Sequence, residues 1–103
     1  MSVTARIVQR FDPRHEREFI ELEQQFAELE AARKDYPDGK RMQPISGRDP
    51  TNTLIWECEF PNLDSAWAAL GHMGTDPDHD ELFERQVKFF QDARIEFYQN
   101  LDF

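Results

Sequence analysis

Hydrophobic and polar positions alternate most clearly between Thr53 and Phe60, in the segment TLIWECEF. Its even-numbered positions are all apolar, whereas the positions between them are mostly acidic or polar. This period of two is typical of a half-buried strand. Turn-forming residues precede the segment at 49–52 and follow it at Pro61 and Asn62. We therefore expect a strand with one apolar face and one largely acidic face.

Three other segments are predicted to be strands. Val3 to Phe11 and Arg94 to Phe103 each place most of their apolar side chains on one face. Lys40 to Arg48 is a weaker candidate because Pro44 and Gly47 interrupt it, which favours an edge strand or a bulged strand. We expect this segment to form a hairpin with the strand at 53–60.

Helices are predicted where Asp or Asn precedes a stripe of apolar residues at three- and four-residue spacing. The first begins at Asp12-Pro13, and its acidic residues between the stripe positions are expected to face solvent. A short helix follows Asn62, and another begins at Asp76-Pro77 and continues to Ala93, with a break between the two near Gly74. The stripes are Phe19, Leu22, Phe26, Leu29 and Ala32, then Leu63, Ala66, Trp67 and Leu70, then Leu82, Phe83, Val87, Phe90 and Ala93.

The resulting order is strand, helix, strand, strand, helix, strand. This order predicts a ferredoxin-like βαββαβ fold of the α+β class, with a four-stranded antiparallel sheet and the helices on one face. With 103 residues, the chain is expected to form a single domain over residues 1–103.

The sheet face away from the helices is predicted to carry charges of both signs with apolar residues between them. An open, solvated face would account for the charges alone. The apolar residues favour a homodimer in which two sheets meet face to face. The predicted dimer-face residues are Arg6, Val8, Arg10, Ile55, Glu57, Glu59, Arg94 and Glu96.

The charge balance narrows the classes of partner. Twenty-one acidic and twelve basic residues give a formal net charge of −9, which disfavours binding to nucleic acid or to an anionic membrane surface. No apolar segment approaches the length of a membrane span, and the N-terminal residues lack the apolar core of a signal peptide. The single cysteine, Cys58, is expected to be buried and reduced. These features predict a cytoplasmic protein.

The segment from Thr53 to Phe90 resembles the dimeric α+β barrel superfamily. The residues that carry the likeness to antibiotic-biosynthesis-type monooxygenases are Trp56-Glu57, Asp64, Ala66-Trp67, Leu70, His72, His79 and Phe83. The segment Asp76 to Phe90, followed by Glu96-Phe97-Tyr98, is similar to the NIPSNAP-like branch. The resemblance implies homodimerisation and a pocket between the sheet and the helices.

The monooxygenase branch implies oxidation of planar aromatic substrates without a bound metal or flavin. His72 is then a candidate catalytic base, with Trp67 and Tyr98 as candidates that shape the pocket; alternatively, His72 is a surface or helix-capping residue. Trp67 and His72 are also the nearest matches to the haem ligands of haem-degrading relatives. However, the first strand has no Asn where those relatives have one, which disfavours haem degradation.

Three functions therefore remain open: binding of a small aromatic or hydrophobic molecule by a homodimer of the NIPSNAP-like kind, cofactor-independent monooxygenation of a quinol-type substrate, or a structural or regulatory dimer without a ligand. No cofactor is predicted. No metal site is predicted either, because the acids at Asp76, Asp78 and Asp80 lack the remaining positions of a calcium loop and fit helix capping better.

Overall fold

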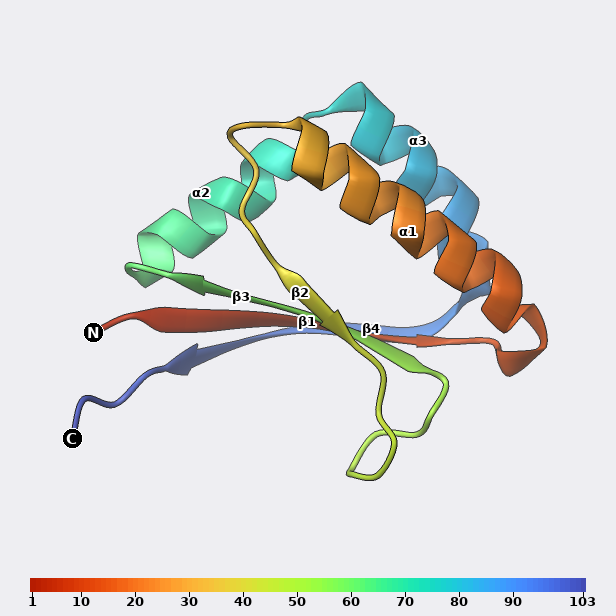
Figure 1. Ribbon diagram of the computed structural model, residues 1–103, viewed down its shortest axis with the longest axis horizontal. Coiled ribbons are helices and arrows are strands. Elements are labelled where there is room, and N and C mark those ends of the chain that lie inside the picture. The colour runs from red at the N-terminus through yellow and green to blue at the C-terminus, as the bar shows by residue number, and fades with distance from the viewer.

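The computed structural model describes residues 1–103 and has a four-stranded antiparallel sheet covered by helices on one face (Figure 1). The strand order is β2-β3-β1-β4, so the first and third strands are the central neighbours. This confirms the predicted ferredoxin-like α+β fold. The elements are β1 (Val3–Phe11), a 3-10 turn (Pro13–His15), α1 (Glu16–Ala32), β2 (Lys40–Met42), β3 (Thr53–Phe60), α2 (Leu63–Met73), α3 (Pro77–Gln86), a second 3-10 turn (Val87–Phe89) and β4 (Phe90–Gln99).

The last strand differs from its prediction at both ends. It begins at Phe90, four residues before the predicted start, and it ends at Gln99. Phe90 is held in the sheet because it pairs with Phe11, and its ring also lies 5.7 Å from that of Phe19. The apolar spacing at Val87, Phe90 and Ala93 fitted a helix equally well, so the predicted helix was too long at this end.

The second strand is shorter than predicted. Only Lys40–Met42 pairs with β3, and the following residues, 43–52, form a loop rather than a continued strand and a short turn. Pro44 has no amide hydrogen to donate to a ladder. In Figure 1 this loop lies on the side of the sheet away from the helices.

Side-chain caps confirm the predicted starts of α2 and α3, whereas Asp12 caps the 3-10 turn that leads into α1 at Glu16. The side chains of Asp12, Asn62 and Asp76 each accept a hydrogen bond from a backbone amide in the first turn that follows. Asp76 also accepts hydrogen bonds from the Tyr36 hydroxyl (2.6 Å) and from Nε of Arg33 (3.1 Å), and these bonds hold the pKa of its carboxyl well below the ordinary value. This cap therefore also ties the C-terminal end of α1 to the start of α3.

The core lies between the sheet and the helices in two groups. One group packs beneath α2, and the other includes the stacked rings of Phe11 and Phe19, whose centroids are 4.5 Å apart. The first group is Ala5, Trp56, Cys58, Phe60 and Ala66, and the second is Phe11, Phe19 and Leu54.

Gly39 lets the chain pass directly over the indole of Trp56. A Cβ atom at position 39 would lie only 2.2 Å from the indole ring. Trp56 is buried and its Nε1 donates to Glu30, so the ring has little freedom to move aside.

We expect Gly39→Ala to lower the free energy of unfolding by about 1–3 kcal/mol, because the added methyl group must displace the indole or the backbone. Denaturation in urea measures the change. Gly47→Ala is the matched control, since a Cβ atom there meets no other atom within 4 Å. Equal stabilities of the two variants would contradict the proposed close packing.

Candidate functional site

A cavity of about 380 Å³ lies between the helices and the sheet. Residues from all four strands line it, together with residues from the three helices. Its apolar wall includes Ile7, Phe26, Trp56, Phe83, Phe90 and Ile95. Because Ile95 on the edge strand β4 and Phe83 on α3 are partly exposed, the cavity is open to solvent on this side.

One end of the cavity is formed by a buried polar cluster, which we call the Arg41 cluster: Arg41, Glu23, Glu30, Trp56 and Gln86. Arg41 on β2 donates through Nε to Glu23 and through both terminal nitrogens to Glu30. Trp56 Nε1 donates to Glu30 at 3.3 Å, and Gln86 Nε2 donates to Glu23 at 2.9 Å. Every member of the Arg41 cluster therefore has at least one partner, as buried polar groups require.

Glu23 and Glu30 are 6% and 9% exposed, so the prediction that the acidic residues of the first helix all face solvent was wrong for these two. The two residues lie seven positions apart, in step with Phe19 and Phe26 on the buried stripe of α1. The sequence alone shows that both residues share the helical spacing of the apolar stripe. What made their burial hard to foresee was Arg41, the cation that compensates them from a separate segment.

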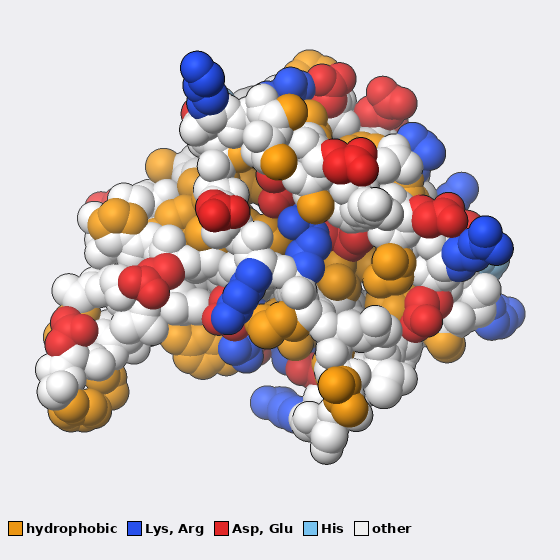
Figure 2. Space-filling model, viewed as in Figure 1, with side chains coloured by type: hydrophobic (Ala, Val, Ile, Leu, Met, Phe, Trp, Pro, Cys, Tyr) orange, Lys and Arg blue, Asp and Glu red, His pale blue; other side chains and the backbone are white.

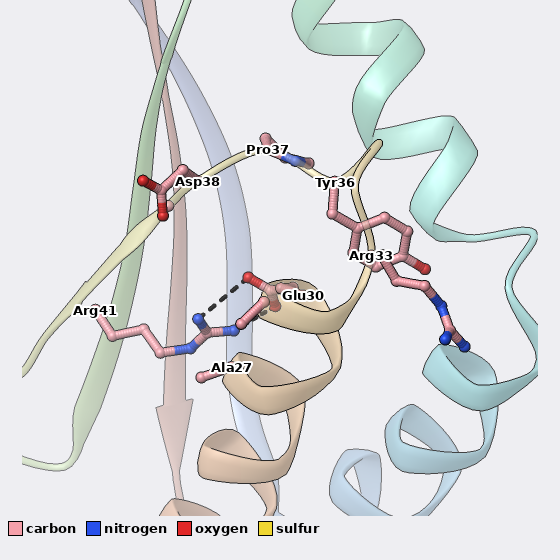
Figure 3. A pocket seen from close by; sticks show the side chains of 9 residues that line it. Ala27, Glu30, Arg33, Tyr36, Pro37, Asp38 and Arg41 are labelled. Carbon is pink, nitrogen blue, oxygen red and sulfur yellow. Dashed lines mark hydrogen bonds and ion pairs between the residues drawn. The ribbon is translucent and has the colours of Figure 1, made fainter.

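Burial and ion pairing act in opposite directions on the pKa of Arg41. Burial by itself would lower the pKa of the guanidinium, but its hydrogen bonds to Glu30 and Glu23 and the charges of both outweigh this effect and raise the pKa. Arg41 therefore stays charged. Figure 3 shows its side chain pointing toward Glu30, whereas Arg33 points away toward α3.

The Arg41–Glu30 pair also borders a second, more polar cavity of about 410 Å³ (Figure 3). The segment between α1 and β2 forms much of its lining, including Tyr36, Pro37 and Asp38. Figure 2 shows charged side chains of both signs in a depression between the helices and the sheet, beside hydrophobic ones. The ion pair thus separates the two cavities.

His79, on the first turn of α3, lines the cavity between helices and sheet. Its ring lies edge-on to Phe26 with the centroids 4.9 Å apart. Burial lowers the pKa of His79, against the opposing charges of Glu30, Asp76, Glu23 and Asp80. The imidazole is therefore mainly neutral at pH 7 and can accept a proton or a hydrogen bond.

The structure does not bring together the three residues that the sequence suggested for a pocket. His72, on the last turn of α2, pairs with Asp35, is half exposed and does not line the cavity between helices and sheet. Trp67 is also exposed, with its ring 5.0 Å from that of Phe97. Tyr98 lies on the opposite face of the sheet, beneath the guanidinium of Arg6.

The predicted dimer-face residues lie on the sheet face without helices, where their charges are largely paired within the chain. Arg6 pairs with Glu57 at 2.8 Å, and Arg94 pairs with Glu96 at 2.8 Å. Arg94 also pairs with Asp49 of the loop 43–52, so this loop lies over part of the face. The other predicted residues are Val8, which is 2% exposed within the single chain, the partly buried Ile55, and the exposed Arg10 and Glu59.

No group of three or more His, Cys, Asp or Glu side chains is arranged to hold a metal ion. No helix has the length and apolar composition needed to cross a lipid bilayer.

The fold is shared with proteins of two named groups. A NIPSNAP family protein from Agrobacterium tumefaciens superposes with a TM-score of 0.82 and 14% sequence identity, over 99% of this chain and 88% of that chain. A NIPSNAP domain protein from Burkholderia xenovorans superposes with a TM-score of 0.79 and 17% sequence identity, over 100% of this chain and 97% of that chain. An antibiotic-biosynthesis-monooxygenase-like protein from Nitrosomonas europaea superposes with a TM-score of 0.71 and 11% sequence identity, over 97% of this chain and 90% of that chain.

These identities establish the fold alone. They confirm, at that level, the resemblance to NIPSNAP-like and monooxygenase-like proteins. No protein-family model matches the sequence, and no curated protein matches it.

We expect Arg41→Ala to lower the free energy of unfolding by about 3 kcal/mol, because it leaves two buried carboxylates without their cation. The matched control is Arg17→Ala. Arg17 pairs with Glu21 on the exposed surface of α1, where its side chain is 88% exposed, so its loss should change the free energy by about 0.5 kcal/mol or less. Chemical denaturation of both variants measures the difference, and an equally small effect at Arg41 would contradict this account of the Arg41 cluster.

Proposed function

We propose that the protein is a cytoplasmic homodimer that binds a small aromatic or hydrophobic molecule in the cavity between its helices and its sheet. The observation that carries this proposal is the cavity itself. Its volume of about 380 Å³ lies within the range of small-molecule sites, about 300–1,000 Å³. Eight of its fifteen lining residues are hydrophobic, four of them aromatic, and a few polar groups lie among them, which is the usual composition of such sites.

We expect 1-naphthol, a planar aromatic probe, to bind with one site per chain. Ala93 lines the cavity from β4, so Ala93→Phe should reduce the space and weaken binding at least about tenfold, a loss of roughly 1.4 kcal/mol. Isothermal titration calorimetry measures the dissociation constants of 1-naphthol for the wild type and for Ala93→Phe. Ala68→Phe, at an exposed position of α2 outside the cavity, is the matched control.

Binding that is absent, or that Ala93→Phe and Ala68→Phe change equally, would argue against the cavity as the ligand site. A circular dichroism spectrum of each variant establishes that the fold is intact before the titration.

The homodimer is proposed to form through the sheet face without helices. Ile55 lies there among the charges, partly exposed, and Tyr98 is exposed nearby. Glu57 is central to the face because it pairs with Arg6 and lies 3.9 Å from the amino group of Lys40.

Glu57→Lys should therefore weaken dimerisation, because it places a third cation beside Arg6 and Lys40 on both copies of the face. Sedimentation equilibrium gives the dissociation constant. Glu28→Lys makes the same change of charge at an exposed position of α1 and should leave the constant unaltered. An unchanged dimer in Glu57→Lys, or a monomeric wild type, would refute this interface.

A second candidate function, cofactor-independent monooxygenation of a quinol-type substrate, is supported by the neutral imidazole of His79 in the cavity wall. A neutral imidazole can take the proton of a phenolic hydroxyl as a general base. The resulting phenolate would react with dioxygen, so that one oxygen atom enters the ring as a quinone carbonyl and the other leaves as water. His72, the base suggested by the sequence, stands as the alternative.

If this activity is present, 1-naphthol and dioxygen will be consumed in equal amounts and 1,4-naphthoquinone will form. We expect His79→Ala to abolish the turnover and His72→Ala to retain most of it, because only His79 lines the cavity. Quinone absorbance and oxygen uptake measure the reaction. The reverse result would assign the base to His72.

A further inference from the structure

We propose that the cavity selects molecules that join an aromatic or hydrophobic body to a protonated amine, with the ammonium group held at the Arg41 cluster. This inference rests on the proposed function and names the chemical class of its ligand.

The formal charge of the Arg41 cluster is the first argument. Two buried carboxylates, Glu23 and Glu30, face a single guanidinium, that of Arg41. His79 nearby is mainly neutral at pH 7. Arg94 also lines the cavity, but its guanidinium is bound to Asp49 and Glu96. The Arg41 cluster therefore carries one negative charge more than its own cation compensates, and a buried charge is stabilised by a compensating partner.

The hydrogen-bonding groups at this end of the cavity also favour a ligand with a protonated amine. Gln86 is 1% exposed, and its Nε2 donates to the Glu23 carboxylate and, at 3.4 Å, to the backbone carbonyl of Phe19. Both of these groups only accept hydrogen bonds, so they fix which way the amide points. The Gln86 Oε1 atom then accepts no hydrogen bond from the protein, and Gln86 is one of the residues that line the cavity.

An ammonium group offers three donors and no acceptor. The oxygens of Glu23 and Glu30 already accept hydrogen bonds from Arg41, Gln86 and Trp56. Each carboxylate has about four lone-pair sites, so lone pairs remain for an ammonium group, beside the Gln86 oxygen and the neutral imidazole. Binding of a carboxylate ligand is disfavoured here. The Arg41 guanidinium is already bound to Glu23 and Glu30, and the Arg41 cluster keeps one excess negative charge.

The wall next to the Arg41 cluster suits a cation with an aromatic body. Phe26, Phe83 and Phe90 line the cavity together with Trp56. Aromatic faces attract ammonium groups through cation–π interactions, and they pack against an aromatic ligand.

The test uses three ligands of nearly equal shape: 2-phenylethylamine, 2-phenylethanol and 3-phenylpropanoate, which are cationic, neutral and anionic at pH 7. We expect the amine to bind about tenfold or more tightly than the alcohol, because its hydrogen bonds are charge-assisted. The carboxylate should bind more weakly than the alcohol. Isothermal titration calorimetry at 0.15 M salt measures all three, so that the overall negative charge of the protein is screened.

Glu30→Gln removes the uncompensated charge while keeping an acceptor for Arg41 and Trp56. It should reduce the preference for the amine over the alcohol to about twofold or less, a loss of most of the tenfold ratio. Glu28→Gln changes the net charge equally on the exposed side of the same helix and should keep the preference. Glu23→Gln serves in the same way if Glu30→Gln fails to fold.

The outcomes separate this inference from the proposed function. If the alcohol or the carboxylate binds as well as the amine, or if Glu30→Gln and Glu28→Gln keep the same preference, the inference is overturned and the ligand-binding cavity stands. If none of the three ligands binds and 1-naphthol does not bind either, both proposals are overturned.

Discussion

The ion pairs that Arg41 makes with Glu23 and Glu30 are the interaction on which the helix-facing side of the molecule depends. β2 has only three residues, so its ladder to β3 contributes few hydrogen bonds. The guanidinium compensates for this by joining the edge strand to two residues of α1 that lie about two turns apart. Because the charges are buried, removal of either partner would be costly, and this fixes the position of α1 over the sheet.

The same interaction explains why a cavity persists beneath the helices. Apolar side chains alone would tend to close together, as they do around Phe11 and Phe19. At the Arg41 cluster the hydrogen bonds require particular distances and directions, which limits how far the helices can settle onto the sheet. Stability and the proposed ligand binding are therefore coupled at these residues, and a change that relaxes the cluster should alter both.

Much of the fold followed from local sequence patterns. The caps at Asp12, Asn62 and Asp76 and the alternation at 53–60 specify elements whose signals lie within a few neighbouring residues. The end of α3 was misjudged because Phe90 fits both a helical stripe and a strand, and its pairing with Phe11 decides between them. Pairing with a residue 79 positions away in the sequence thus determines that Phe90 belongs to a strand and not to a helix.

The candidate site was harder to predict for the same reason. The sequence singled out His72 as the candidate base and included His79 only in the monooxygenase-like spacing, and it could not show that His79 lines the cavity whereas His72 does not. Glu23 and Glu30 carried a signal in their helical phase, yet their meaning required Arg41 from another element. Sites assembled from several segments depend on tertiary contacts that residue spacing does not record.

The loop 43–52 has a consequence for how two copies could approach each other. It lies over the sheet face without helices and is anchored there by Asp49 to Arg94, near the buried Val8. Arg6, Ile55 and Tyr98 line one pocket together with residues of this loop, so the more open part of the face lies outside that pocket, toward Thr4 and Glu59. A twofold axis between two sheets would have to pass near that part, and the exposed Ile45 of each loop would project beside the other subunit. The length of this loop would thus set the offset between the two sheets.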